Sequence, residues 1–263
     1  MGRIQPIIGG GGVSGTLSWT TLIDADFAGS AGSALANGGT ISRSGVTWTL
    51  RAQSATFQTW TPATDGVGLA VTNGTATTNA LLADIADAAI LGRDPDDYDV
   101  LAVQALWADV TQTGNAGFIG VCLGHEDTGV ARGGMDRPLM AGHFRTTASN
   151  WFARLSTSTG LLAEERFLAT GVADPSGVGV VTGGLFLPGL GVQMFGAIDR
   201  ATLYDDPIDL RGVSVLREPG PTERPQIDRV GVIAISITDT TMVATLSRLR
   251  IQHCRMPGAP EPS

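Results

Sequence analysis

The sequence predicts an all-β protein, an antiparallel sandwich with one short helix and an extended N-terminal arm. Three observations support this fold class. The 263 residues include 36 glycines and are only 16% charged, a composition that suits short strands with many turns. The 43% hydrophobic content is enough for a large core. In many segments apolar residues recur at every second position, which is the period of a strand.

The clearest pattern lies between Tyr98 and Gly124, where the apolar runs YDVLAVQALWADV and GFIGVCLG flank the turn-like TQTGNA. Both runs are apolar on both faces, as expected of central strands that are covered on both sides. We therefore expect a buried hairpin at the middle of the sandwich, with Trp107 in the core. Cys122 should be a buried free thiol, and a disulfide with Cys254 requires that their strands adjoin.

Residues 1–16 are predicted to be a separate arm. Its apolar members stand just before four consecutive glycines and are Ile4, Pro6, Ile7 and Ile8. Because glycine runs lose much entropy on ordering, one interpretation is a flexible tail. The other is an apolar assembly arm that docks on a neighbouring subunit. The expected organisation is thus an arm at 1–16, a jelly-roll sandwich domain at 17–254 and an extended tail at 255–263.

Alternating segments between turn residues predict the other strands. Before the central hairpin they are Thr16–Phe27, Thr40–Arg43, Val46–Arg51, Ala55–Thr59 and Val67–Val71. After it they are Leu139–Thr146, Asn150–Ser156, Leu161–Thr170, Leu185–Leu187 and Leu190–Ile198. Ser44-Gly45 and Pro188-Gly189 are the expected turns within two of the strand pairs, whereas Gly171–Gly184 is expected to be loosely ordered.

The last predicted element is a terminal hairpin, Val230–Thr238 and Thr241–His253, around Asp239-Thr240. Its second strand alternates between apolar and polar residues, with Leu249 and Ile251 facing the core. The residues expected to face outward are Arg248, Arg250 and Gln252. This alternation is typical of an antiparallel sheet with one solvated face.

The one exception to the strand pattern is Asn79–Gly92, which predicts a short helix. Its apolar residues recur at spacings of three and four and are Leu81, Leu82, Ile85, Ala89 and Ile90. Asn79 could cap the helix start and Gly92 could end it.

The order of these features resembles the concanavalin A-like lectin/glucanase sandwiches, including laminin-G-like modules. The segments that carry the resemblance are DADFAG, LLADI, DYDVLAVQALW, AGFIGVCLG, NWFARLST and RVGVIAISITDTTMVATLSRLRI. They extend from about residue 17 to residue 254 and end in an alternating strand with Ala244, Leu246, Leu249 and Ile251. The resemblance implies a jelly-roll fold, which recurs in phage tail and capsid proteins that often carry glycine-rich arms.

Charge and motifs argue against several classes of function. The net charge is −8 and the 17 basic residues, all arginine, are scattered, so we expect no nucleic-acid partner. No apolar run approaches membrane-spanning length, and we expect no membrane insertion. Hydrolases of the resembled family carry an E-x-D-x-x-E strand that this chain lacks. The acidic pairs Glu126-Asp127 and Glu164-Glu165 are adjacent, so on a strand their side chains point to opposite faces.

A calcium site is one interpretation of the acidic run at Asp94, Asp96, Asp97 and Asp99. Hard cations such as Ca²⁺ bind several carboxylate and carbonyl oxygens in a compact loop. The run lacks the D-x-D-x-D-G spacing of a calcium loop, so a solvated turn is the other interpretation. Ca²⁺ is the one cofactor that the sequence raises.

Aromatic and histidine residues supply the remaining candidates. Trp60 and Trp151 are the candidate carbohydrate-stacking residues, although core packing is favoured over stacking for them. Trp60 is the tryptophan expected to be most exposed. His125 and His143 could lie close together beside Glu126, but we expect them to be surface or rim histidines.

From these features the sequence predicts a non-enzymatic structural or adhesion component of a phage virion, made in the host cytoplasm. We expect a homo-oligomer, with a trimer favoured, that contacts other virion proteins and has host surface carbohydrate as a candidate ligand. The alternatives are a carbohydrate-active enzyme whose acids come from different strands and a free carbohydrate-binding lectin. No catalytic residue is assigned.

Overall fold

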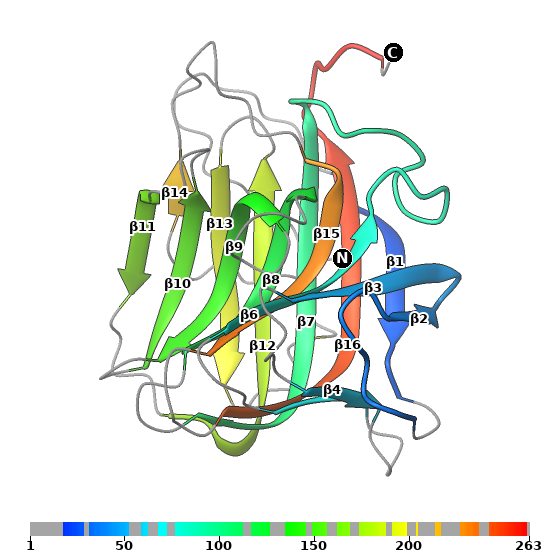
Figure 1. The fold of residues 1–263 in the computed structure, drawn as a ribbon. Helices are drawn as coiled ribbons and strands as arrows, with labels where there is room; N and C mark the ends of the chain where they lie inside the picture. The colour runs from blue at the N-terminus through cyan, green and yellow to red at the C-terminus, as the bar shows by residue number, and fades with distance from the viewer. Residues whose placement is uncertain are drawn as a thin grey trace.

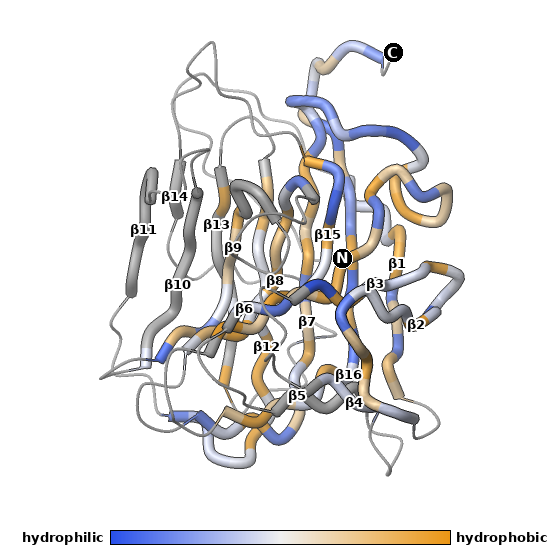
Figure 2. The backbone as a smooth tube through the Cα atoms, in the orientation of Figure 1, coloured by the Kyte–Doolittle hydropathy of each residue, from blue (hydrophilic) through white to orange (hydrophobic). Residues whose placement is uncertain are grey.

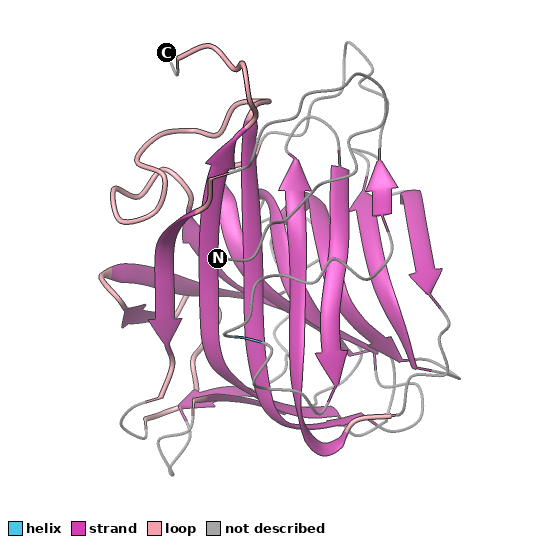
Figure 3. Cartoon of the chain, turned by 180° about the vertical axis from the view of Figure 1, so that it is seen from behind, coloured by secondary structure: helices cyan, strands magenta, loops and turns pink. Residues whose placement is uncertain are grey.

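Two antiparallel sheets form a sandwich in the computed structural model of the chain (Figures 1 and 3). The structure describes residues 18–28, 32–52, 59–62, 68–72, 77–112, 117–126, 135–145, 149–156, 162–168, 174–187, 191–198, 204, 214–216, 227–236 and 242–261. The all-β jelly-roll sandwich predicted from the sequence is confirmed. The predicted arm at residues 1–16 lies outside the described residues.

The first sheet is organised around two long neighbouring strands, β7 and β16. Its order is β14 (Ser214–Leu216), β13 (Gly191–Ile198), β12 (Ser176–Leu187), β7 (Asp99–Gln112), β16 (Met242–Arg255), β5 (Leu69–Thr72) and β4 (Thr59–Pro62). β1 (Thr20–Asp26) also pairs with β16, beside the half that β5 leaves open. β12 begins within the segment that the sequence analysis expected to be loosely ordered.

The second sheet has β8 and β15 at its centre. Its order is β11 (Leu162–Leu168), β10 (Ser149–Ser156), β9 (Met135–Arg145), β8 (Gly117–Glu126), β15 (Arg229–Ser236), β6 (Thr77–Asp84), β3 (Val46–Ala52) and β2 (Thr40–Arg43). Ser44-Gly45 forms the predicted turn between β2 and β3, and both residues have positive φ, as a tight hairpin turn requires. The predicted pairing across Pro188-Gly189 is also confirmed, because Leu187 pairs with Gly191.

The main core lies between the two sheets, and hydrophobic segments follow the central strands (Figure 2). Leu101, Val103 and Trp107 of β7 enter this core from one sheet, and Ile119 and Val121 of β8 enter it from the other. Trp107 is completely buried, as expected, and its indole N–H donates to Thr182 Oγ1 at 2.9 Å. A buried indole thus keeps a hydrogen-bond partner.

The prediction of a central hairpin is wrong. β7 and β8 are both central strands, but β7 pairs with β12 and β16 while β8 pairs with β9 and β15, in the opposite sheet. The predicted terminal hairpin fails in the same way, because β15 and β16 also belong to different sheets. A run that is apolar on both faces shows that a strand is covered on both sides, but it does not identify the strand's neighbour. Within β16 the expected inward positions, Leu249 and Ile251, are buried in the core.

The predicted helix at Asn79–Gly92 is also wrong, since residues 77–84 form β6 and residues 85–93 form turns. Leu81 and Ala83 point into the main core, while Ala80 and Leu82 pack on the outer face of the second sheet. Asp84 and Asp87 then accept hydrogen bonds from backbone amides two residues further on. Such local bonds compete with a helix and favour a turn. No α-helix is present in the described part of the chain.

Phe118 covers two glycines on the outer face of the second sheet. Gly120 and Gly142 pair across β8 and β9. A Cβ built on Gly120 would stand 2.4 Å from both Phe118 Cζ and the Ala141 carbonyl oxygen. Only glycine therefore leaves room for the ring.

The described part of the chain contains no long apolar helix that could span a membrane.

The two cysteines are free and buried, so the prediction for Cys122 is confirmed. Cys122 belongs to the apolar cluster on the outer face of the second sheet, and Cys254 belongs to the corresponding cluster on the first sheet. The strands do not adjoin, and no disulfide joins them. Burial raises the pKa of the Cys122 thiol well above its ordinary value.

Candidate functional site

The densest set of charged contacts lies where β7 begins, around the buried carboxylate of Asp99. Arg93 donates to its two oxygens at 2.7 Å each, and Arg255 donates at 3.0 Å. His253 Nε2 lies 2.8 Å from Oδ1, and the Asp96 backbone N–H donates at 2.8 Å. Burial alone would raise the pKa of Asp99, but the hydrogen bonds from His253, Arg93 and the Asp96 amide hold it well below its ordinary value.

The β7–β16 ladder brings these groups together from distant parts of the sequence. Arg255 is the Cα partner of Asp99, and His253 pairs with Leu101, two positions further along β7. Alternate residues of a strand share a face, so His253 and Arg255 both approach Asp99. The sequence analysis recognised Asp99 but missed these partners. Its outward-facing prediction stopped at Gln252, and no local signal connects positions separated by about 150 residues.

The C-terminal tail is bound to the same rim. The Met256 N–H donates to the Tyr98 carbonyl at 2.9 Å, and Arg255 Nη2 donates to the Pro260 carbonyl at 2.7 Å. In Figure 1 this end of β7 and β16 lies at the top, next to the C-terminus. We use the term rim for residues 93–99 together with 253–261.

The acidic run that suggested calcium is part of this rim. The buried carboxylate of Asp99 is balanced by two guanidinium groups and an imidazole. Asp96 pairs with Arg255 at 3.0 Å, and Asp94 is exposed. No group of three or more histidine, cysteine or acidic side chains in the described ranges is arranged to hold a metal ion. In this structure the counter-charges of Asp99 are therefore the guanidinium groups of Arg93 and Arg255.

The other end of β7 carries a buried neutral pair. His143 is completely buried, and its Nδ1 lies 2.6 Å from Gln112 Oε1. Gln112 Nε2 donates to the Gly117 carbonyl at 3.4 Å and contacts Met242 Sδ at 3.7 Å. With the glutamine amide in this orientation, His143 carries its proton on Nδ1 and donates it to Gln112.

Burial lowers the pKa of His143 to about 4. Two charged groups act on it with opposite signs: Asp174 raises the pKa and Arg145 lowers it. These two groups pair with each other at 2.7 Å, and Ser149 donates to Asp174. The imidazole of His143 is therefore neutral at physiological pH.

The expectation of rim histidines is wrong for His143. Its neighbours across β8 and β9 place it on the core face with Ala141. His125 does lie near a rim, a third of its side chain is exposed, and its Nδ1 is 2.7 Å from Asp228 Oδ2. The two histidines are at separate positions of the β8–β9 ladder, so they form no common site.

The structure tests only one of the two tryptophans considered for carbohydrate stacking. Trp60 is completely buried in the main core, so the favoured core packing is confirmed and its candidate stacking role is wrong. Its position near a turn suggested exposure, but β4 pairs with β5 and lays the ring against the sandwich interior. Trp151 lies in β10, and its side chain is outside the described residues.

The two tyrosines of the chain have opposite environments. Tyr204 is completely buried, with the guanidinium groups of Arg248 and Arg250 at 4.8 and 4.5 Å from the ring centre. Both arginines also pair with Asp24, at 2.8 and 3.0 Å. Tyr98, at the rim, is 42% exposed and is the one exposed large hydrophobic side chain in the described part of the chain.

No protein-family profile matches this sequence, and a search of curated proteins finds no relative. Among solved structures, the chain is similar to arcelin-5, a lectin-like defence protein from Phaseolus vulgaris, with TM-score 0.47, 8% identity and coverage of 80% of this chain and 93% of that one. The seed lectin of Lotus tetragonolobus gives TM-score 0.44 and 10% identity over 80% of this chain and 94% of that one.

A sialidase from Trypanosoma rangeli gives TM-score 0.43 and 13% identity over 87% of this chain but only 29% of that one. None of these three structures is named as a phage protein. At these TM-scores the similarities carry no argument about what the chain binds. The sandwich fold rests on the strand pairing itself.

Proposed function

We propose that the chain is a non-enzymatic structural and adhesion component of a phage particle, with host surface carbohydrate as the ligand of its adhesion role. The observation that carries the proposal is that aspartate side chains form ion pairs with arginines and so connect different strands. Asp99 joins the start of β7 to the end of β16. Asp24 joins β1 to β16, and Asp84 joins β6 to β15. Such pairing supports a rigid scaffold that presents its rims to a partner.

The same observation argues against Asp99 as the general acid of a glycoside hydrolase, the rival interpretation. Retaining and inverting glycosidases both need a carboxylic acid that is protonated at the working pH. Asp99, the most buried acid of the rim, has the opposite property, because its hydrogen bonds hold its pKa low. The phage context rests on the resemblance in the sequence and on the apolar, glycine-rich residues 1–16.

Two measurements on the full chain test this function. Purified particles of the phage whose genome encodes the chain should contain it in stoichiometric amounts by mass spectrometry, and its absence from them would overturn the virion assignment. Incubation with a panel of oligosaccharides should release no reducing ends. Release of reducing ends would instead support the carbohydrate-active enzyme.

A further inference from the structure

Tyr98 presents an aromatic ring to solvent from a fixed backbone. Its N–H donates to Asp96 Oδ1 at 2.8 Å, and its carbonyl accepts from the Met256 N–H at 2.9 Å. The next residue, Asp99, is completely buried and held by the arginine and histidine contacts of the rim. A side chain on such a base loses little freedom when a ligand binds to it.

Tyr98 is more exposed than the other large aromatic side chains that the structure describes. Trp48, Trp60, Trp107 and Tyr204 are completely buried, and Trp19 is partly buried against the apolar cluster of the first sheet. Tyr98, at 42%, is the exposed large hydrophobic side chain among the described residues. Exposed aromatic rings on a rigid surface favour ligands with an apolar face and polar edges.

Polar side chains lie on the same segment as Tyr98. Arg93 keeps 25% of its side chain exposed and Asp96 keeps 38%. An ionised carboxylate has about four acceptor positions and a guanidinium has five N–H donors, so both can take further hydrogen bonds beside those described. Asp94 is exposed on this segment as well. These groups can pair with hydroxyls at the edge of a ligand whose face lies on Tyr98.

The charge of the rim selects the kind of ligand. The acidic side chains outnumber the basic ones and are Asp94, Asp96, Asp97, Asp99 and Glu261. The guanidinium groups opposite them are those of Arg93 and Arg255, and both contact Asp99. A negative rim repels sialylated or uronic sugars and tolerates neutral ones.

We propose that the rim is a binding site for neutral sugars, with Tyr98 as the residue on which the sugar ring stacks and Arg93 and Asp96 as hydrogen-bonding partners. This inference rests on the proposed adhesion function and deepens it. It moves the stacking role from Trp60, which is buried, to Tyr98, which lies between Asp97 and Asp99 of the acidic run.

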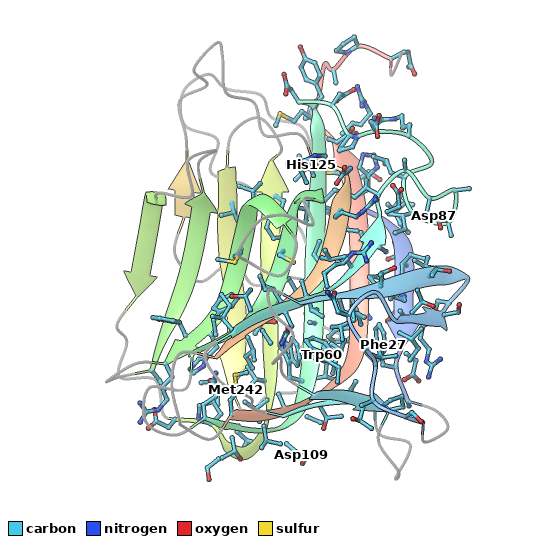
Figure 4. All side chains as sticks on the ribbon, in the orientation of Figure 1. Phe27, Trp60, Asp87, Asp109, His125 and Met242 are labelled. Atoms are coloured by element: carbon cyan, nitrogen blue, oxygen red, sulfur yellow. The ribbon has the colours of Figure 1, made fainter. Side chains whose placement is uncertain are left out.

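The test compares the full chain with three variants on immobilised glycans ending in galactose, glucose, mannose, N-acetylglucosamine or sialic acid. Tyr98→Ala removes the ring, and Tyr98→Phe keeps it. Asp109→Asn is the matched control, because Asp109 is exposed at the opposite end of β7 (Figure 4) and asparagine tolerates its positive φ. The full chain should bind at least one neutral glycan and bind sialylated ones less well.

Tyr98→Ala should weaken that binding roughly tenfold, while Tyr98→Phe and Asp109→Asn stay close to the full chain. Unchanged thermal melting of all variants shows that the sandwich is intact. If the full chain binds no glycan, the proposed carbohydrate ligand fails. If the full chain binds but Tyr98→Ala binds equally well, the rim site alone is overturned. An equal loss in Tyr98→Phe would exclude stacking as its basis.

Discussion

A titratable side chain is completely buried at each end of β7, and the two are stabilised in different charge states. Asp99 is the first residue of the strand. At the other end, His143 of β9 contacts Gln112. Asp99 meets two guanidinium groups and an imidazole and stays charged. His143 meets a neutral amide and stays neutral. The ionisation state of a buried group is thus decided by its partners.

The difference has consequences for stability. A buried charge that is paired and hydrogen-bonded is tolerated, but removing one member leaves the others uncompensated. A buried neutral imidazole is tolerated until the pH falls far enough for the unfolded chain to bind its proton. The Asp99 end should therefore be sensitive to mutation, and the His143 end should be sensitive to acid.

The largest effect is expected from Asp99→Asn, which keeps the side-chain shape and removes the charge. Arg93, His253 and Arg255 would then lose their shared negative charge, and the free energy of unfolding should fall by about 3 kcal/mol. Urea unfolding at pH 7 measures the change. Asp96→Asn, whose carboxylate is 38% exposed, is the control and should cost less than about 1 kcal/mol. Equal losses in both variants would contradict the special role of Asp99.

The next largest effect is expected from the protonation of His143 as the pH falls. Its folded pKa is about 4 against an ordinary value of 6.5, so between these values the unfolded chain binds the proton and the folded chain does not. Stability should accordingly fall as the pH drops through this window, by about 3 kcal/mol in all. The lowered pKa of Asp99 has the sign of a stabilising carboxylate, and its contribution is lost only at still lower pH.

Denaturant unfolding at several pH values, comparing the native chain with His143→Asn, tests this assignment. The variant should lose most of the slope between pH 6.5 and 4, whereas the control His125→Asn, which leaves His143 in place, should keep it. A slope that survives in His143→Asn would show that another group is responsible.

Gln112→Glu should place a carboxylate beside His143, much as Asp99 lies beside His253 at the other end of β7. The new carboxylate would accept the Nδ1 proton of His143 and favour the imidazolium, raising the pKa of His143 by roughly 1–3 units. Titration of the histidine ring protons by NMR follows this directly. The His125 ring signal in the same spectra serves as the internal reference. A His143 pKa that stays near 4 would refute the idea that the partner sets its ionisation.

The smallest effect concerns the thiols. Burial, and then the charge of Asp99, raise the pKa of Cys254 to about 12, whereas burial alone acts on Cys122. Both should resist alkylation in the native state. In Asp99→Asn the ratio of the Cys254 rate to the Cys122 rate should rise about twofold, because only the first thiol loses a nearby negative charge. Mass spectrometry of alkylated peptides gives both rates, and an unchanged ratio would rule out that influence.

The fold class and most of the strands could be predicted from the sequence alone. Period-2 alternation located β2, β3 and β10 closely, and it placed Leu249 and Ile251 of β16 in the core. It also identified Trp107 and Cys122 as buried. These features could be predicted because they depend on the face to which a side chain points, and that face is fixed by local backbone geometry.

The neighbours of each strand, and the partners of its side chains, depend on tertiary structure. β7 and β8 look like a hairpin in the sequence, yet they lie in opposite sheets, because apolar residues on both faces satisfy either arrangement. Residues 79–92 have helical spacing, but pairing of β6 with β15 and β3 places them in a sheet and turns. Asp99 acquires His253 and Arg255 only through the β7–β16 register. Such contacts join positions far apart in the chain, and one sequence holds no local signal for them.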